Sequence, residues 1–152
     1  MSSVRSASLR ETAHSFCCAL LSPPPPSDLL ARHFGTTPKI TEHGPEWAQS
    51  RLPFLAKTFT GTRQCEDYFQ MMSQVLDLSL PSDAFPGKDG FIVDAEANMV
   101  SVVGKGTLTS RKTGKAWDEH FIYRFSEFDH EGRIGHWEIW ADPLSAWEAV
   151  GS

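Results

Sequence analysis

The sequence predicts an α+β fold in which helices pack on one face of a curved antiparallel sheet. In the first half of the chain, apolar residues recur at helical spacing within residues 4–21 and again within residues 61–76. From residue 91 the period changes to two, and successive segments alternate apolar and polar side chains. Helices followed by a run of adjacent strands are typical of the α+β class.

Length and charge favour one globular domain that binds neither nucleic acid nor membrane. A chain of 152 residues can bury a core without disulfides or metals. Its net charge is −5, and no cluster of Lys and Arg stands out, which disfavours a nucleic acid or an anionic membrane as partner. We expect one domain over residues 1–152, with an N-terminal helix at 4–21, a proline-rich corner at 22–27 and the main body at 28–150.

The cysteines and the N-terminal segment favour a cytoplasmic location. Two of the three cysteines are adjacent and no C-x-x-C pair occurs, which favours reduced thiols and argues against a zinc site. The stretch SFCCALL is apolar, but Glu11 and His14 precede it and no cleavage site follows, so we expect no signal peptide. No apolar run approaches membrane-spanning length.

The helices of the first half have clear expected boundaries. The helix at 4–21 must end at SPPPP, because proline lacks a backbone donor and cannot continue a helix. Ser27 or Asp28 can then cap a short second helix through LLARHF. Residues 36–45 are expected to be extended, and Thr62 can cap the helix at 61–76.

Four strands and a short final helix are expected in the second half. The strand candidates are FIVDAE (91–96), NMVSVVGKGTLTS (98–110), AWDEHFIYRFSEF (116–128) and RIGHWEIWA (133–141). Gly and Asn turn residues separate them. Asp142 can cap the closing helix, with Pro143 as its first residue.

The strand at 117–126 presents an aromatic face that contains one acid, Glu119. Matching apolar faces across the preceding turn pairs Gly106 with Glu119 and Gly104 with Phe121. Two glycines opposite these residues leave side-chain volume unfilled, which predicts a pocket. The alternative stays open: the glycines could mark a bend in the sheet, and Glu119 could simply pair with a base.

The segments GKAWDEHFIYRF and WEIWADPLSAW resemble fungal members of the SnoaL-like group, within the nuclear transport factor 2-like superfamily. The resemblance covers most of residues 28–150, since ITEHGP and FTGTRQCEDYF also occur in the matching order. It implies a cone of about four to six antiparallel strands around about three helices, enclosing an apolar cavity. It also implies a homodimer and cofactor-free isomerase, cyclase or lyase activity on polyketides or terpenoids of secondary metabolism. The same fold also serves as a non-catalytic binding or dimerisation module.

Cofactor-free chemistry of this kind needs a proton donor and a proton acceptor in a dry cavity. We expect Glu119 and Glu138 to be this acid/base pair, with His43 and Asp142 as supporting groups. Glu42, beside His43, is expected to be exposed. No histidine spacing indicates a metal site. The aromatic residues expected to contact an apolar substrate are Trp117, Phe121, Tyr123 and Trp140.

The side on which Glu138 lies depends on the turn FDHEGRI. A two-residue turn at 131–132 pairs Phe125 with Glu138 and places this acid in the pocket. A three-residue loop with a glycine bulge pairs Arg124 with Glu138 and turns Trp137 inward instead. Both registers are compatible with the sequence. We favour the first, because the resemblance implies polar groups in the cavity.

Overall fold

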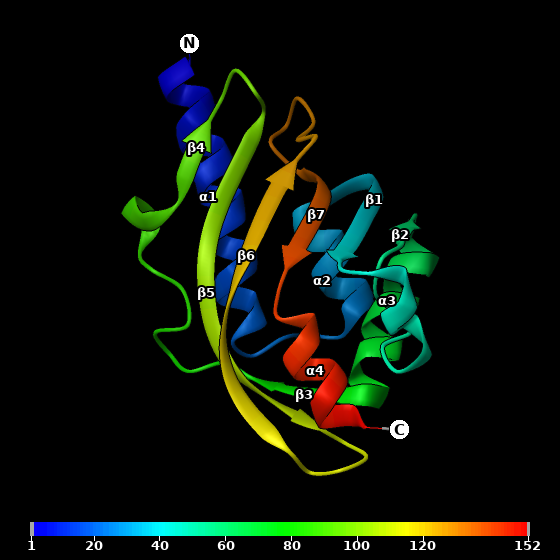
Figure 1. Cartoon of the computed structure of the whole chain (residues 1–152). Coiled ribbons are helices and arrows are strands. Elements are labelled where there is room, and N and C mark those ends of the chain that lie inside the picture. The colour runs from blue at the N-terminus through cyan, green and yellow to red at the C-terminus, as the bar shows by residue number, and fades with distance from the viewer. Residues whose placement is uncertain (1, 152) are drawn as a thin grey trace.

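The computed structural model describes residues 2–151 and confirms the α+β architecture (Figure 1). Within these residues the chain forms four α-helices and two short 3-10 helices, η1 (Glu46–Ser50) and η2 (Lys88–Gly90). The α-helices are α1 (Ser2–Leu20), α2 (Pro26–His33), α3 (Thr62–Val75) and α4 (Pro143–Val150). None of the helices in this range has the length and apolar composition that a membrane crossing requires.

Residues 2–151 contribute seven strands to one curved, unclosed sheet. The strands are β1 (Phe34–His43), β2 (Thr58–Thr60), β3 (Leu76–Ser79), β4 (Ile92–Asp94), β5 (Met99–Ser110), β6 (Ala116–Ser126) and β7 (Ile134–Trp140). Their order is β2-β1-β7-β6-β5-β3, and β4 also pairs with β5. The expected antiparallel arrangement holds except at one place, where β1 lies parallel to β7 and makes the sheet mixed.

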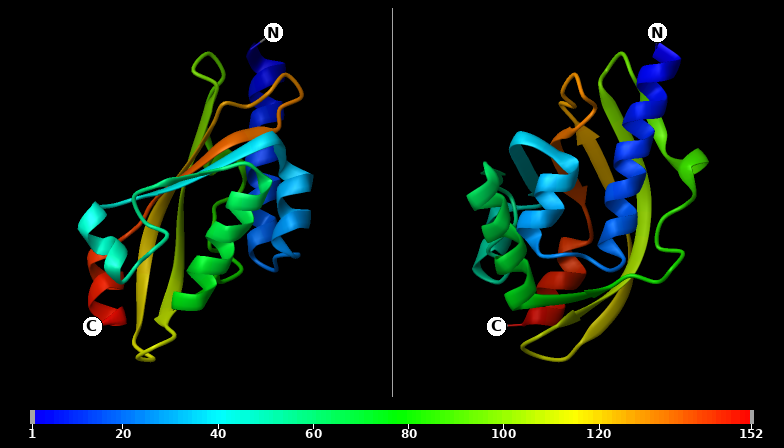
Figure 2. Two further views of the ribbon diagram at one scale, coloured as in Figure 1. Left: turned by 90° about the vertical axis from the view of Figure 1, so that its right-hand side faces the viewer. Right: turned by 180° about the vertical axis from the view of Figure 1, so that it is seen from behind.

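Helices α1, α2 and α3 lie along one face of the sheet, as the two views of Figure 2 show. The aromatic core lies between these layers. The ring of Phe16 in α1 packs edge-on against Phe125 at a centroid distance of 5.6 Å and against Trp137 at 4.9 Å. All three side chains are buried, so this contact fixes α1 to β6 and β7.

The helix caps agree only in part with the expectation. The side chain of Asp142 accepts a hydrogen bond from the Ser145 amide at 3.0 Å, which confirms it as the cap of α4. The expected caps of α2 are wrong, because Pro26 already occupies its first turn and no side chain caps it. Thr62 is likewise the first residue of α3, and Gly61 precedes it at a φ of 87°.

The expected register of β5 and β6 is confirmed, with Gly106 opposite Glu119 and Gly104 opposite Phe121. The expected unfilled volume at these glycines is wrong. A Cβ on Gly104 would lie 2.5 Å from the ring of Phe121 and 2.6 Å from that of Phe85. The glycine therefore allows the loop before η2 to pack Phe85 closely against the sheet.

The favoured register of β7 is wrong, and the alternative register is present. Arg124 pairs with Glu138, and Phe125 pairs with Trp137. The Asp129 amide donates to the Arg133 carbonyl at 3.0 Å, and Gly132 has a φ of 81°. These features define a three-residue loop with a left-handed glycine, which shifts the pairing by one residue and reverses the faces of β7.

Candidate active site

A cavity of about 800 Å³ lies between the helices and the inner face of the sheet. Helix α3 contributes Phe69 and Met72, and the sheet contributes Phe121, Tyr123 and Trp137. Most of its lining is aliphatic or aromatic, which suits a largely apolar molecule. Its acidic lining residues are Glu42, Glu66, Asp77 and Glu119.

The tetraproline corner and strand β3 contribute to the same cavity. Pro23, Pro24 and Pro26 all line it, as do Leu78 and Leu80. Because proline fixes its own backbone, this corner gives the cavity a stiff edge between α1 and α2. The sequence interpretation of SPPPP as a helix-to-helix corner is confirmed, and the corner additionally borders the cavity.

Glu42 is a buried acid of the cavity, and the expectation that it is exposed is wrong. It is 8% exposed, and the hydroxyl of Tyr68 donates a 2.7 Å hydrogen bond to its Oε1. Burial raises the pKa of Glu42 to about 7, against the lowering effect of the Tyr68 hydrogen bond, and the charge of Glu119 adds to the rise. The carboxyl can therefore hold or release a proton near neutral pH.

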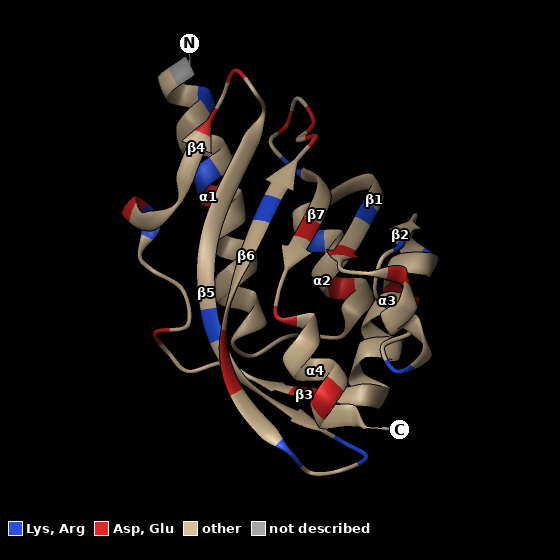
Figure 3. Cartoon of the chain, in the orientation of Figure 1, with Lys and Arg blue, Asp and Glu red and all other residues tan. Residues whose placement is uncertain are grey.

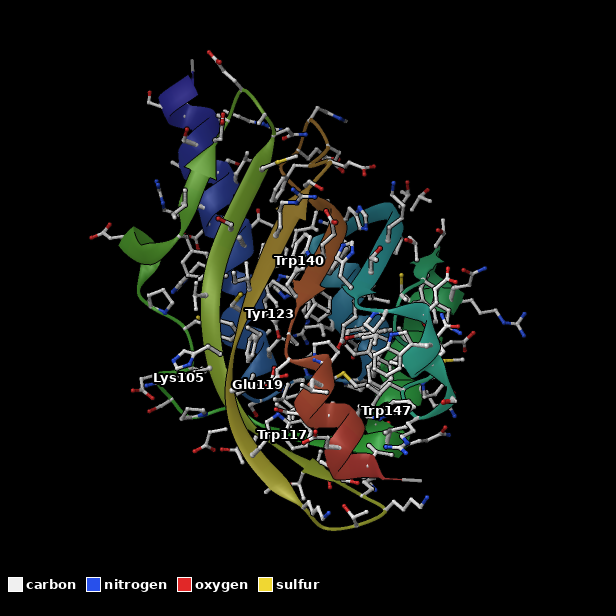
Figure 4. The ribbon with its side chains drawn as sticks, viewed as in Figure 1. Lys105, Trp117, Glu119, Tyr123, Trp140 and Trp147 are labelled. Carbon is white, nitrogen blue, oxygen red and sulfur yellow. The ribbon has the colours of Figure 1, made fainter. Side chains whose placement is uncertain are left out.

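Glu119 is held by two hydrogen bonds from fixed donors. The indole Nε1 of Trp117 donates to its Oε1 at 2.6 Å, and the amide of Asp142 donates to its Oε2 at 3.1 Å. Burial raises the pKa of Glu119, while these two hydrogen bonds lower it and partly offset the rise. Figure 4 shows Trp117, Glu119 and Tyr123 along β6.

Both acids also border a second, enclosed space of about 20 Å³ next to the cavity. The two spaces also share Leu76, Leu108 and Ala141 in their linings, so both acids lie where the second space adjoins the cavity. The arrangement brings two buried carboxyls to one apolar cavity.

The hydroxyl of Tyr123 is available to a ligand. The residue is 4% exposed and lines the cavity, yet within residues 2–151 its hydroxyl has no hydrogen-bond partner. Burial raises its pKa well above the usual value, so the hydroxyl keeps its proton. Its ring lies 4.9 Å from Phe121 and 5.1 Å from Trp137, measured between centroids, which fixes its orientation.

Glu138, expected as the partner of Glu119, lies on the opposite face of the sheet. Its Oε1 accepts hydrogen bonds from Arg124 Nε at 3.0 Å and Nη2 at 2.8 Å, and its Oε2 lies 2.8 Å from Nε2 of His43. Burial alone would raise the pKa of Glu138, but the bonds from Arg124 and His43 lower it overall. A carboxylate held ionised outside the cavity is unsuited to exchange protons with a ligand inside it.

His43 and Trp140 accompany Glu138 outside the cavity. Their rings stack at a centroid distance of 4.3 Å and an angle of 11°, and the guanidinium of Arg124 lies 5.1 Å from the Trp140 ring. Neither residue lines the main cavity. The register of β7 separates Trp140 from Glu119. His43, at the end of β1, borders the small second space together with Glu42 and Glu119, although its ring nitrogen binds Glu138.

Of the other predicted site residues, two line the cavity and two hold Glu119 in place. Phe121 and Tyr123 line the cavity, as expected. Trp117 holds Glu119 through its indole, and Asp142 does so through its backbone amide while its side chain caps α4. Both residues therefore hold the carboxylate of Glu119 in place, and neither is among the residues that line the main cavity.

The alternation of inward and outward side chains along β1 could have predicted that Glu42 is buried. Ile40 is fully buried, and in a strand the residue two positions later faces the same side. Trp137 faces the cavity through the register that was not favoured. Among residues 2–151, no group of three or more His, Cys, Asp and Glu residues is arranged to hold a metal ion.

The curved sheet with its helices and cavity is the nuclear transport factor 2-like (NTF2-like) α+β cone fold. No protein-family model matches the sequence, and no curated protein is significantly similar to it. The structural likeness therefore comes from solved structures of low sequence identity, which share the fold.

Three of these solved structures illustrate the likeness. An NTF2-like protein of unknown function from Burkholderia pseudomallei has a TM-score of 0.72 at 14% identity, over 95% of this chain and 98% of that one. A candidate polyketide cyclase from Xanthomonas campestris has a TM-score of 0.70 at 10% identity, over 97% and 99%. A proposed isomerase from Bacillus subtilis has a TM-score of 0.67 at 17% identity, over 98% and 94%.

Proposed function

We propose that this chain is a cofactor-independent acid/base enzyme, an isomerase, cyclase or lyase that acts on a hydrophobic small molecule. The observation that carries the proposal is the pair of buried acids, Glu42 and Glu119, in one apolar cavity. Two carboxyls whose pKa values are raised by burial are suited to take and return protons near neutral pH.

The surroundings of the two acids suggest different roles. Glu119 receives N–H hydrogen bonds on both oxygens, which stabilise its ionised form and suit a general base. Glu42 has a pKa of about 7 and suits a general acid. In the proposed reaction, Glu119 takes a proton from a carbon next to a carbonyl, and the electron pair moves onto the carbonyl oxygen. Tyr123 donates a hydrogen bond to this oxygen. Where a C=C bond adjoins the deprotonated carbon, the electron pair returns from the oxygen through the conjugated system, the double bond shifts next to the carbonyl, and Glu42 protonates the far carbon. The proton on Glu119 is then lost to water and Glu42 takes one up, which restores both carboxyls.

The comparisons support the proposal through the names of proteins with this fold. One is named as a candidate polyketide cyclase and another as a proposed isomerase. The sequence resemblance adds a narrower expectation, a polyketide or terpenoid intermediate of fungal secondary metabolism. This substrate class stays a prediction, as does a cytoplasmic location.

Proton exchange in heavy water tests the proposed chemistry without knowledge of the natural substrate. Wild-type protein should speed the incorporation of deuterium next to the carbonyl of 2-tetralone, an apolar bicyclic ketone. Glu119→Gln should slow this exchange by about 100-fold or more, because it removes the base. Binding of such ketones without any exchange would instead favour the alternative function, a non-catalytic binding module.

We also propose that the chain forms a homodimer through the outer face of its sheet. Val103, Ile122 and Trp140 lie side by side on β5, β6 and β7 and are 52%, 46% and 37% exposed. A row of exposed apolar side chains across three strands favours burial against a second surface. The resemblance to a family that often dimerises through its sheet makes a second copy the expected partner.

A further inference from the structure

We propose that the cavity selects its ligand by charge, accepting uncharged or cationic apolar compounds and rejecting those that carry a carboxylate, phosphate or sulfate. The inference rests on the proposed function, because it concerns the substrate of the same cavity. It follows from the set of acidic side chains that line the cavity and from the absence of Lys, Arg and His from its lining in residues 2–151.

The charged side chains of the cavity all have one sign. Glu42 and Glu119 lie at its buried end, and Glu66 and Asp77 lie toward solvent. No Lys, Arg or His side chain lines this cavity in the part of the chain that the structure describes. An anion that enters would lose its water and meet no positive charge in exchange.

Three basic residues around this region are paired with carboxylates, one of them at the exposed rim of the cavity and two outside it. Arg111 Nη2 lies 2.8 Å from Oδ1 of Asp77 at the exposed side, and Arg124 is bound to Glu138 on the outer face. Lys105 lies 3.0 Å from Asp83, also outside the cavity. Figure 3 shows the basic positions of the sheet on the ribbon, which lie on β1, β5, β6 and the β5–β6 hairpin.

The aromatic residues on the inner wall of the cavity favour neutral or cationic ligands. Phe69, Phe121, Tyr123 and Trp137 present aromatic rings to the cavity, and ring faces attract cations and repel anions. The free hydroxyl of Tyr123 can serve a neutral carbonyl or hydroxyl group. The buried indole N–H of Trp137, which has no hydrogen-bond partner within residues 2–151, is a further donor on this wall. A neutral ketone, ester or lactone therefore finds hydrogen-bond donors and needs no counter-ion, whereas a carboxylate finds donors but no positive charge.

The charge of the ligand limits which reactions can precede the proposed reaction of this cavity. The reaction that supplies the substrate must release a compound without an anionic group, such as an ester, lactone, aldehyde or ketone. Free acids and thioesters that retain a phosphorylated carrier are excluded as ligands of the cavity.

Three matched naphthalene ligands test the inference in binding experiments that need no turnover. We would titrate wild-type protein with methyl 2-naphthoate, 2-naphthoate and 2-naphthylmethylammonium near neutral pH and measure affinity by calorimetry. The neutral ester should bind roughly 100-fold more tightly than the carboxylate. The ammonium compound should bind within about tenfold of the ester or more tightly.

Equal or tighter binding of 2-naphthoate would overturn the inference. Rejection of the ammonium compound as strongly as the carboxylate would also overturn it, because burial of any charge would then explain both results. If Glu119→Gln left proton exchange intact while the carboxylate was still rejected, the proposed function would fail and the charge selection would stand.

Two cavity variants and one control variant test whether the residues of the cavity cause the preference for the ester over the carboxylate. Glu119→Gln should reduce the difference in affinity between methyl 2-naphthoate and 2-naphthoate. Met72→Lys should raise the affinity for 2-naphthoate by about tenfold, since it adds a cation to the cavity wall. Asp118→Asn removes one negative charge on the exposed face of the same strand. Asp118→Asn should leave the difference in affinity between the ester and the carboxylate unchanged. An equal effect of Asp118→Asn and Glu119→Gln on this difference would show that the cavity acid is not its cause.

Discussion

At the scale of single residues, Glu42 shows how its surroundings turn a strand carboxyl into a group that can titrate near neutral pH. It follows Ile40 on the inward side of β1 and accepts its hydrogen bond from Tyr68, itself a buried residue. Removal from water disfavours the charged form more than the one hydroxyl bond favours it. Glu138 is similarly buried but has a guanidinium partner, and its pKa moves the other way.

The raised pKa of Glu42 predicts a pH-dependent loss of stability that Glu42→Gln should remove. Below about pH 4.5 the folded and unfolded states both hold the proton, so no difference arises. Between about pH 4.5 and 7 the unfolded chain releases it while the folded chain keeps it, so the free energy of unfolding falls as pH rises. This loss amounts to about 3 kcal/mol at most.

Urea unfolding of the wild type and of Glu42→Gln across this pH range measures the effect. The free energy of unfolding of the variant, relative to wild type, should increase as pH rises through the window. The amide oxygen of the substituted side chain can still accept the hydrogen bond from Tyr68, so packing changes little. A difference that stays constant with pH would show that Glu42 titrates normally.

At the scale of elements, the β6–β7 connection decides which side chains reach the cavity. Gly135 is central to it, because a Cβ at this position would lie 2.2 Å from the backbone oxygen of Glu127. Glu127 itself has a φ of 54°, in the left-handed region. The close approach of these two backbones stabilises the register in which Trp137 faces inward and Glu138 outward.

Gly135→Ala should therefore destabilise the protein by about 3 kcal/mol, since the clash is with backbone and cannot be relieved by a side-chain rotation. Chemical denaturation checks the magnitude. Gly87→Ala is a matched control, because a Cβ at Gly87 meets nothing within 4 Å. Similar stability losses in both variants would contradict the importance of the close approach.

Much of the fold follows from sequence periodicity, and the site follows only in part. The long helices, the β5–β6 pairing and the cap by Asp142 were predictable, because each depends on local spacing or on matching apolar faces. The short strands β2 and β3 were not predicted, since three or four residues carry too little pattern. The side occupied by Glu138 depends on one loop residue, and both registers satisfied the local rules.

At the scale of the whole molecule, the sheet separates two environments with different uses. Its inner face and the helices enclose the cavity with Glu42 and Glu119. Its outer face has the ion pairs of Glu138 and the exposed row of Val103, Ile122 and Trp140. The proposed chemistry and the proposed assembly should thus be separable by mutation, because each depends on alternate residues of the same strands.

Ile122→Asp tests the assembly. Wild-type protein is expected to be a dimer by light scattering after size-exclusion chromatography, and the variant a monomer at the same concentration, because a charge would face the apolar row of the partner. The cavity should keep its affinity for methyl 2-naphthoate. A monomeric wild type would contradict the proposed interface.

The central claim is that Glu119, inside the cavity, transfers protons and that Glu138, on the outer face, does not. Glu119→Gln and Glu138→Gln make the same chemical change on neighbouring strands of one sheet, so the rate of deuterium incorporation into 2-tetralone compares them directly. We predict a loss of about 100-fold or more for Glu119→Gln and a rate within a fewfold of wild type for folded Glu138→Gln. Retained exchange in Glu119→Gln together with lost exchange in Glu138→Gln would contradict the account.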